Sequence, residues 1–241
     1  MPPLSPTPTT DLLPAQRRIL ESGHWFAGLP ASMQLALCDK AAVISLRADE
    51  VLFHRGDENN GLYGALDGAI CFGTVNLAGK ESVVGLAEPP QWFGEVALLD
   101  GGPRTHRAWA DSSASLAHVP LPAVTKWLSE HPAHWQYIGR LAVHKLRVMF
   151  GALEDASLHP ARERLIRCLV LLARSYGQRN ASLPRTLRVS QERLGTMLAL
   201  SRQTVNALLQ DLEREHLIVC LRGGVRIVDF PRLLALEASI Q

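Results

Sequence analysis

The segment from Phe93 to Thr105 combines residue types that could bind a phosphate-containing ligand. A pocket for a nucleotide phosphodiester needs a cation, free main-chain amides from the start of a short helix, and an acceptor for the ribose 2′-hydroxyl. Here Arg104 can supply the cation, and the turn that begins at Gly94 can supply the amides. Glu95 can supply the acceptor, and Thr105 adds a hydroxyl beside the phosphate. The segment therefore predicts an anion-binding site.

The same segment has a second interpretation, in which it holds no ligand. Glu95 and Arg104 would then form a structural ion pair. His106 directly follows Thr105 and could line a pocket if one exists. The residues of this segment predicted to contact a ligand are Gly94, Glu95, Val96, Ala97, Arg104, Thr105 and His106.

A second set of polar residues lies between Ser190 and Leu212, where the pattern predicts two short helices and a tight turn. Ser190 and Ser201 are typical N-caps, because their hydroxyls can accept hydrogen bonds from unpaired amides of the first helical turn. Leucines and a valine at helical spacing form a shared core and leave polar side chains outside. Polar residues at the start of a second helix can meet base edges in a major groove.

A hairpin is predicted after these helices, with Leu217–Leu221 and Val225–Val228 flanking the turn Arg222-Gly223-Gly224. Its basic tip would lie over DNA phosphates as a wing. The alternative is a small helical subdomain that makes no DNA contact. The residues predicted to contact DNA are Ser190, Ser201, Arg202, Gln203, Thr204, Asn206, Ala207 and Arg222.

The distribution of charge supports a nucleic-acid partner for the C-terminal part. Residues 158–241 hold 13 arginines, no lysine and 7 acidic residues, a net charge of +6, whereas the first 157 residues carry 12 basic and 16 acidic residues, a net charge of −4. A total net charge of +2 therefore hides a basic module. Such asymmetry raises the expectation of DNA binding.

The elements that must position these residues change along the chain. Apolar spacing predicts helices over Leu12–Leu20 and Ala31–Ala42, and then short strands from Val43 to Pro120. Asp67-Gly68 predicts a hairpin turn between two of them. Closely spaced strands of this kind indicate an antiparallel roll or barrel. The predicted strands are Val51–His54, Gly61–Leu66, Ala69–Val75, Glu81–Leu86, Ala108–Asp111 and Ser115–Val119.

A long helix is predicted from Pro132 to about Ser157 and carries an apolar stripe. The stripe consists of Trp135, Ile138, Ala142, Leu146, Met149, Leu153 and Ala156. It could belong to an ordinary core helix, but a helix that joins two modules has little of its own domain to pack against, which favours a dimer seam. His159-Pro160 breaks the helix and is the candidate hinge. A further helix is predicted over Ala161–Tyr176, followed by a polar segment from Gly177 to Arg185.

Two motifs resemble the CRP/FNR family of bacterial transcription regulators. Leu200-Ser201-Arg202-Gln203-Thr204-Val205 looks like the family's recognition-helix signature, and residues 93–105 resemble the phosphate-binding cassette of cyclic-nucleotide-binding domains. The resemblance implies an α+β fold with a leader and N-terminal helix (1–24), an antiparallel β-roll (25–130), a dimerisation helix (131–158) and a winged helix-turn-helix (159–241). It also implies a homodimer in which a bound cyclic nucleotide shifts the dimer helix and hinge, and so sets the spacing of two recognition helices.

The partners that this resemblance implies are operator DNA, a cyclic nucleotide and RNA polymerase. The operator would be roughly palindromic, with half-sites about one helical turn apart. The first arginine of the family's recognition helix matches Arg202, but Gln203 replaces the acid and Ala207 replaces the second arginine. Because glutamine prefers adenine to the cytosine amino group, the half-site is predicted to differ from the family consensus.

A second departure from the family pattern leaves the identity of the effector open. The two positions at which cAMP-binding regulators carry hydroxyls for the adenine fall on Met149 and Phe150, which can only pack against a base. We therefore predict that Met149 and Phe150 contact the ligand without hydrogen bonds to it. The candidates are cAMP, cGMP and cyclic di-GMP, with no permanently bound cofactor. The alternative is a ligand-independent regulator with a vestigial pocket.

Other classes of protein are not indicated. The four cysteines are widely separated and show no zinc spacing, and no hydrolase, metalloprotease or phosphate-loop motif occurs, so neither a metal site nor an enzyme is predicted. Met1–Thr10 is rich in proline and threonine and lacks an apolar signal core, so we read it as a disordered leader. No apolar run approaches the length of a membrane span. These features predict a cytoplasmic protein with no membrane partner.

Overall fold

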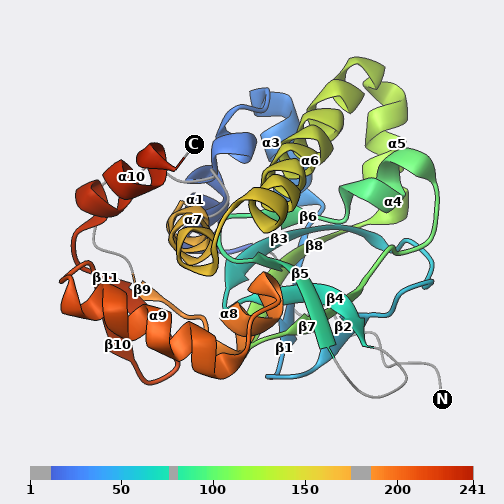
Figure 1. Ribbon diagram of the computed structural model, residues 1–241. Coiled ribbons are helices and arrows are strands. Elements are labelled where there is room, and N and C mark those ends of the chain that lie inside the picture. Colours follow the sequence, from blue (N-terminus) through green and yellow to red (C-terminus); the bar gives the residue numbers. More distant parts are fainter. Residues whose placement is uncertain (1–11, 76–80, 175–185, 241) are drawn as a thin grey trace. The chain divides into compact units, whose positions relative to one another are not determined.

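The computed structural model describes residues 12–75, 81–174 and 186–240, which form two compact units (Figure 1). The first unit contains the chain up to Leu146, and the second contains the chain from Arg147 together with Glu81–Val83. The predicted leader over residues 1–10 and the polar segment over residues 177–185 lie outside the described residues. In the part of the chain that is described, no helix combines the length and the apolar character needed to cross a membrane.

The first unit is built on two four-stranded sheets, with the strand orders β1-β8-β3-β6 and β2-β7-β4-β5. Neighbours such as β1 and β8, β3 and β8, and β4 and β7 pair antiparallel. One buried cluster takes side chains from both sheets, including Leu116 of β8 and Ile70 of β4, so their facing sides form a common core. This confirms the predicted antiparallel roll. The strands are β1 (Ala42–Leu46), β2 (Val51–Phe53), β3 (Gly61–Asp67), β4 (Ile70–Val75), β5 (Glu81–Ala87), β6 (Trp92–Phe93), β7 (Arg107–Ala110) and β8 (Ala114–Pro120).

The prediction of a hairpin at Asp67-Gly68 is wrong. The strands on either side, β3 and β4, belong to different sheets, so the turn is a corner between the sheets. Gly68 has a φ of +70°, whereas Asp67 is not among the residues with positive φ, as a type I′ turn would require. A Cβ at Gly68 would lie 2.3 Å from the carbonyl oxygen of Ser113. The close approach of the Ser113 main chain therefore leaves no room for a side chain at this position.

Helices cover the first unit through a second buried cluster, which joins Leu20, Trp92 and Leu128. The helix α3 ends at Asp39, before the predicted Ala42, because Ala42 already pairs with His118 in β1. The helix α5 was not predicted, although a proline in its first turn is a typical start signal. These helices are α1 (Pro14–Glu21), α2 (His24–Ala27), α3 (Ala31–Asp39), α4 (Glu95–Asp100), α5 (Leu121–Glu130) and the 3₁₀ turn η1 (Pro132–His134).

The long helix α6 runs from Trp135 to Leu158, close to its predicted bounds. Ile138 and Leu141, near its start, are buried in the core of the first unit, so this part is an ordinary core helix. Further along, large apolar side chains are exposed. They are Val143, Leu146, Met149, Phe150, Leu153 and Leu158. The helix ends before His159-Pro160, as predicted.

The second unit contains the predicted helix pair and hairpin. Its sheet has the order β10-β11-β9, and its core includes Leu169, Val205 and Leu217. The helix α10 was not predicted, although Asp229 caps it by accepting a hydrogen bond from the main-chain N–H of Arg232 at 3.0 Å. The elements are α7 (Ala161–Ala173), β9 (Thr186–Leu187), α8 (Gln191–Leu198), α9 (Arg202–Arg214), β10 (Ile218–Leu221), β11 (Gly224–Ile227) and α10 (Phe230–Ser239).

Candidate functional site

A sharp turn between β6 and α4 brings the two ends of the 93–105 segment together. Gly94 has a φ of +102°, a conformation that favours glycine. A Cβ at this position would lie 2.7 Å from the carbonyl oxygen of Gly61 and 3.1 Å from Nη1 of Arg104. Gly94 therefore allows the main chain to approach Arg104 closely.

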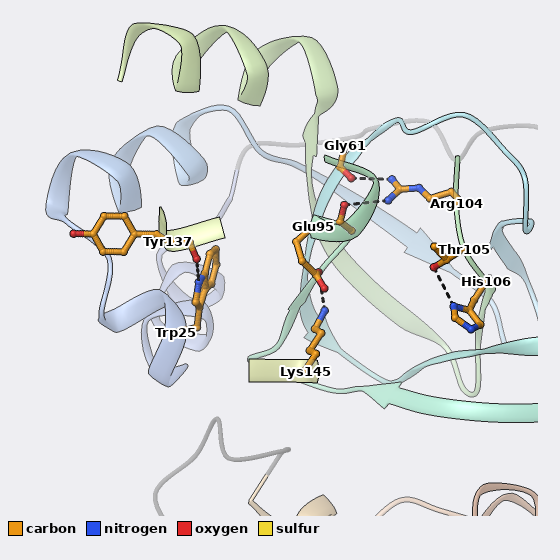
Figure 2. Close-up of polar contacts among 9 residues, drawn as sticks. Trp25, Gly61, Glu95, Arg104, Thr105, His106, Tyr137 and Lys145 are labelled. Carbon is orange, nitrogen blue, oxygen red and sulfur yellow. Dashed lines mark hydrogen bonds and ion pairs between the residues drawn. The ribbon is translucent and has the colours of Figure 1, made fainter. Parts of the chain in front are cut away.

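Arg104 is buried, with 3% of its surface exposed. Its Nη2 donates hydrogen bonds to the carbonyl oxygen of Gly61 at 2.8 Å and to Oδ1 of Asn60 at 2.5 Å. Its Nη1 donates to the carbonyl oxygen of Gly94 at 3.4 Å. Figure 2 shows the guanidinium directed at Gly61, and its carbon lies 4.4 Å from the ring centroid of Phe53. Sequence reasoning did not identify Asn60 or Gly61 as partners.

These surroundings suit an additional anion. The hydrogen-bond partners of Arg104 in the described chain are neutral oxygens, and its buried Nε has no hydrogen-bond partner there. Burial lowers the pKa of Arg104, because it removes the cation from water. A buried cation is costly unless opposite charge and hydrogen bonds compensate it. An anion that accepts from Nε would supply both.

Glu95 is also buried, but it does not serve as the ion-pair partner of Arg104. Its Oε2 lies 2.7 Å from Nζ of Lys145 on α6, and the side chains of Glu95 and Lys145 are 2% and 38% exposed (Figure 2). The structural ion pair considered from the sequence is thus made with Lys145 instead. Sequence reasoning missed Lys145, since fifty residues separate it from Glu95 and no local pattern connects them.

The remaining residues of the segment have different surroundings. Thr105 is exposed, and its Oγ1 lies 3.0 Å from Nδ1 of His106 (Figure 2). Burial and the nearby Arg55 both lower the pKa of His106. The side chain of Val96 is 42% exposed, whereas that of Ala97 is 3% exposed and belongs to the core. Any ligand contact by Ala97 would therefore come from its main chain.

Met149 and Phe150 lie on the part of α6 that belongs to the second unit, and each is 56% exposed. Their side chains are available for contact with another molecule. Their proposed contact with the effector remains a prediction.

The helix pair α8 and α9 has the caps that the sequence predicts. Ser190 Oγ accepts a hydrogen bond from the main-chain N–H of Arg193, and Ser201 Oγ accepts from that of Thr204, each at 3.0 Å. Ser190 and Ser201 thus start the two helices. Within α8, a Cβ at Gly195 would lie 2.8 Å from the carbonyl oxygen of Leu200, so this glycine allows the turn after α8 to pack closely against the helix.

The start of α9 presents the residues of this helix that the sequence predicts to contact DNA. Arg202, Gln203, Thr204 and Ala207 are exposed, and Asn206 is half-buried. Four polar side chains line a hollow on this surface, namely Gln191, Arg202, Gln203 and Asn206. Sequence reasoning omitted Gln191, although its place directly after a cap could have suggested it.

The wing is a hairpin of β10 and β11 in which Leu221 pairs with Gly224. Arg222 lies in the turn and is exposed, and Gly223 has a φ of +81°. This geometry leaves Arg222 free to project at the tip of the hairpin, as predicted.

Two families match the chain in the order that this architecture requires. The cyclic nucleotide-binding domain matches residues 43–131, which contain the segment around Arg104. The Crp-like helix-turn-helix domain matches residues 163–236, which contain α8, α9 and the wing. The chain belongs to the CRP/FNR family of transcription regulators. The sequence-based assignment is therefore confirmed, and this CRP/FNR protein is a DNA-binding transcription regulator with a cyclic nucleotide-binding domain, not an enzyme.

Similar proteins cover most of this CRP/FNR chain. The CRP-like cAMP-activated global transcriptional regulator of Mycobacterium tuberculosis is 26% identical over 89% of this chain and 96% of that protein. The FixK2 structure from Bradyrhizobium japonicum has a TM-score of 0.72 at 19% identity, over 83% of this chain and 99% of that one. The cyclic di-GMP-responsive regulator CLP of Xanthomonas campestris has a TM-score of 0.63 at 17% identity, over 83% of this chain and 100% of that one. The structural likenesses confirm the predicted fold.

Proposed function

We propose that this regulator binds a cyclic nucleotide at Arg104 and that the ligand controls operator binding by a homodimer. The observation that carries the proposal is the environment of Arg104. Its guanidinium is buried among neutral acceptors, and its Nε has no partner in the described chain. The phosphate of a cyclic nucleotide would provide the missing acceptor and would add negative charge beside the guanidinium.

The candidate effectors are cAMP, cGMP and cyclic di-GMP. The Mycobacterium relative is named as cAMP-activated, and the Xanthomonas regulator is described as responsive to cyclic di-GMP. In this chain, Met149 and Phe150 can pack against a base but cannot form hydrogen bonds that distinguish adenine from guanine. Thr105, the exposed hydroxyl beside Arg104, suits the phosphate of either monomeric nucleotide.

Homodimerisation is supported by α6. Its exposed apolar residues recur at intervals of three or four, as Leu146, Phe150 and Leu153 illustrate. Such a stripe would be covered by the same stripe of a second copy in a coiled-coil-like seam. Burial of large apolar side chains of this kind contributes roughly 1.5–3 kcal/mol each when it is complete.

The ion pair between Glu95 and Lys145 supports a link between the ligand site and this helix. Because Glu95 is the proposed acceptor for the ribose hydroxyl, ligand binding would alter the hydrogen bonds of a group that also holds α6. At the far end of α6, Oδ1 of Asp155 lies 2.7 Å from Nε of Arg167 on α7, which makes an ion pair between the two helices. We propose that the α6–α7 junction around His159 is the hinge that transmits this change.

The proposed organisation keeps the boundaries predicted from the sequence: a leader and N-terminal helix, a β-roll over residues 25–130, a dimerisation helix over 131–158 and a DNA-binding module over 159–241. Operator DNA would be contacted by the exposed start of α9, by Arg222 and by the capped ends at Ser190 and Ser201. Because its target is the bacterial chromosome, we place this regulator in the cytoplasm, with RNA polymerase as a further partner.

A second candidate is a regulator that binds DNA without an effector. It is favoured by the pairing of Glu95 with Lys145, which satisfies the carboxylate without a ligand. In that case the pocket would be vestigial, and operator affinity would be the same with and without nucleotides.

The test is calorimetric titration of the purified chain with cAMP, cGMP and cyclic di-GMP, repeated on Arg104→Ala and on Arg47→Ala. Arg47 is an exposed arginine of the same unit and serves as the matched control. We expect one ligand to bind the wild type and Arg47→Ala, and we expect Arg104→Ala to lose that binding. If none of the three ligands binds the wild type, the proposal of a cyclic-nucleotide effector at Arg104 is refuted, and the assignment as a DNA-binding regulator stands without it.

A further inference from the structure

The C-terminal end of α9 is bound by two other helices of the second unit. Glu215 is the C-cap residue of α9, and Nη2 of Arg162 on α7 donates to its Oε1 at 2.7 Å and to its Oε2 at 2.9 Å. The main-chain oxygen of Glu215 accepts a further hydrogen bond, at 3.2 Å, from Nη1 of Arg232 on α10. Arginine can only donate and these oxygens can only accept, so the direction of each bond is certain. We call the contacts of Arg162 and Arg232 with Glu215 the Glu215 clamp.

The start of α7 binds α8 in a similar way. Nη2 of Arg164 donates to the main-chain oxygen of Leu198, the last residue of α8. Arg162 and Arg164 therefore bind the C-terminal ends of both helices of the DNA-binding motif, where the helix dipole favours a cation. Both arginines lie near the start of α7, which begins directly after His159-Pro160. The helix pair is thus attached to the end of α7 that adjoins the proposed hinge.

The Glu215 clamp lies at the opposite end of α9 from the residues predicted to read DNA. The 13 residues from Arg202 to Arg214 make α9 roughly 20 Å long, at a rise of about 1.5 Å per residue. A tilt of about 10° at the clamped end would move the start of α9 by about 3.4 Å, which is the rise of one base pair. Val205, Leu209 and Leu212 anchor α9 in the core, and the clamp adds directional, charge-assisted bonds at its end.

We propose that Arg162 is a positioning residue that sets the half-site spacing that the regulator accepts. The inference rests on the proposed function, in which a homodimer reads two half-sites with its two α9 helices. In such a dimer, the distance between the starts of the two α9 helices must match the operator. Because the Glu215 clamp restrains the tilt of α9, it opposes binding to an operator whose half-sites are one base pair closer or farther apart.

The size of the effect follows from the exposure of the clamp. The side chains of Arg162 and Glu215 are each 37% exposed, and ion pairs that are partly in water contribute little. Binding a shifted half-site by breaking one clamp should therefore cost the wild type about 2–5-fold in affinity. Removal of Arg162 should lower the penalty for a shifted half-site by the same factor.

The experiment measures this penalty as a ratio of affinities. Selection from random duplex DNA with the full-length wild type gives the operator and its spacing, with the effector present if the calorimetry identifies one. Competition binding then compares that operator with two others, whose half-sites are one base pair closer or farther apart. The spacing ratio is the affinity for the selected operator divided by the affinity for a shifted operator.

Three variants test the role of Arg162. Arg162→Gln should lower the spacing ratio by about 2–5-fold, while the base preference read by Arg202 persists. Arg162→Glu combined with Glu215→Arg exchanges the charges of the pair and should restore the ratio. Arg174→Gln is the matched control, because Nη1 of Arg174 lies 4.0 Å from Oε2 of Glu237 on α10 and this pair does not involve α9. The control should keep the wild-type ratio, and thermal unfolding checks that each variant folds.

The outcomes separate this inference from the proposed function. If folded Arg162→Gln keeps the wild-type ratio, or if Arg174→Gln lowers the ratio equally, the positioning role is refuted and the DNA-reading role of α9 stands. A wild type that binds the shifted operators as tightly as the selected one also refutes the positioning role. If the wild type enriches no sequence with two half-sites, the proposed operator binding by a homodimer fails, and the inference fails with it.

Discussion

Lys145→Met removes the cation that pairs with the buried carboxylate of Glu95. The Nζ–Oε2 distance is 2.7 Å, and the side chains of Glu95 and Lys145 are 2% and 38% exposed. Exposed ion pairs contribute about 0–1 kcal/mol, whereas removing one partner of a fully buried pair costs about 3–5 kcal/mol. Because one partner is buried and the other is partly solvated, we expect Lys145→Met to lower the free energy of unfolding by about 2 kcal/mol.

Urea unfolding followed by tryptophan fluorescence can measure this change in the intact chain. All five tryptophans lie before residue 147, at positions 25, 92, 109, 127 and 135, so their emission reports on the unit that contains Glu95. Linear extrapolation then gives the free energy of unfolding. Lys126→Met, at an exposed lysine of α5, is the control and should change stability by less than about 0.5 kcal/mol.

A double-mutant cycle with Glu95→Gln separates the ion pair from other effects of the substitution. If the pair carries the stabilisation, the double variant should lose less than the sum of the single losses, with a coupling of about 1 kcal/mol or more. Additive losses, or a Lys145→Met variant as stable as Lys126→Met, would refute the reasoning.

Three further predictions concern DNA reading, assembly and pH. Arg202→Ala should weaken operator binding by about 1–3 kcal/mol and relax the base preference at one base pair, as measured by mobility shift with substituted operators. Equal weakening on every operator sequence would contradict a base contact by Arg202. Leu153→Glu should shift a dimer towards monomer in light scattering, because Leu153 is 66% exposed on the α6 stripe. Leu13→Glu, at an exposed leucine of the first unit, is the control and should leave the oligomeric state unchanged. Burial raises the pKa of Tyr63 from 10 to about 12. The stability contributed by this phenol is present below pH 10 and is lost as the pH rises from 10 through 12, by up to about 1.4 kcal/mol per pH unit. The difference in unfolding free energy between wild type and Tyr63→Phe should follow this slope, and a constant difference would count against the buried phenol.

The sequence determined features that arise from interactions between near neighbours in the chain. Ser190 and Ser201 cap the helices that follow them, because a cap needs only a hydroxyl and the amides of the next turn. His159-Pro160 ends α6 for an equally local reason. The motif at Arg104 was recognisable for its residue types, and the comparisons confirm the family that it and the recognition helix suggested.

Only the tertiary structure decided which distant groups meet. Lys145 reaches Glu95, Gly61 binds Arg104, and Arg162 binds Glu215, yet no periodicity links the members of these pairs. The corner at Gly68 was misread for the same reason, since its glycine is required by Ser113 on a distant part of the chain. Local propensity sets where an element starts and ends, whereas contacts between elements depend on how their buried faces pack.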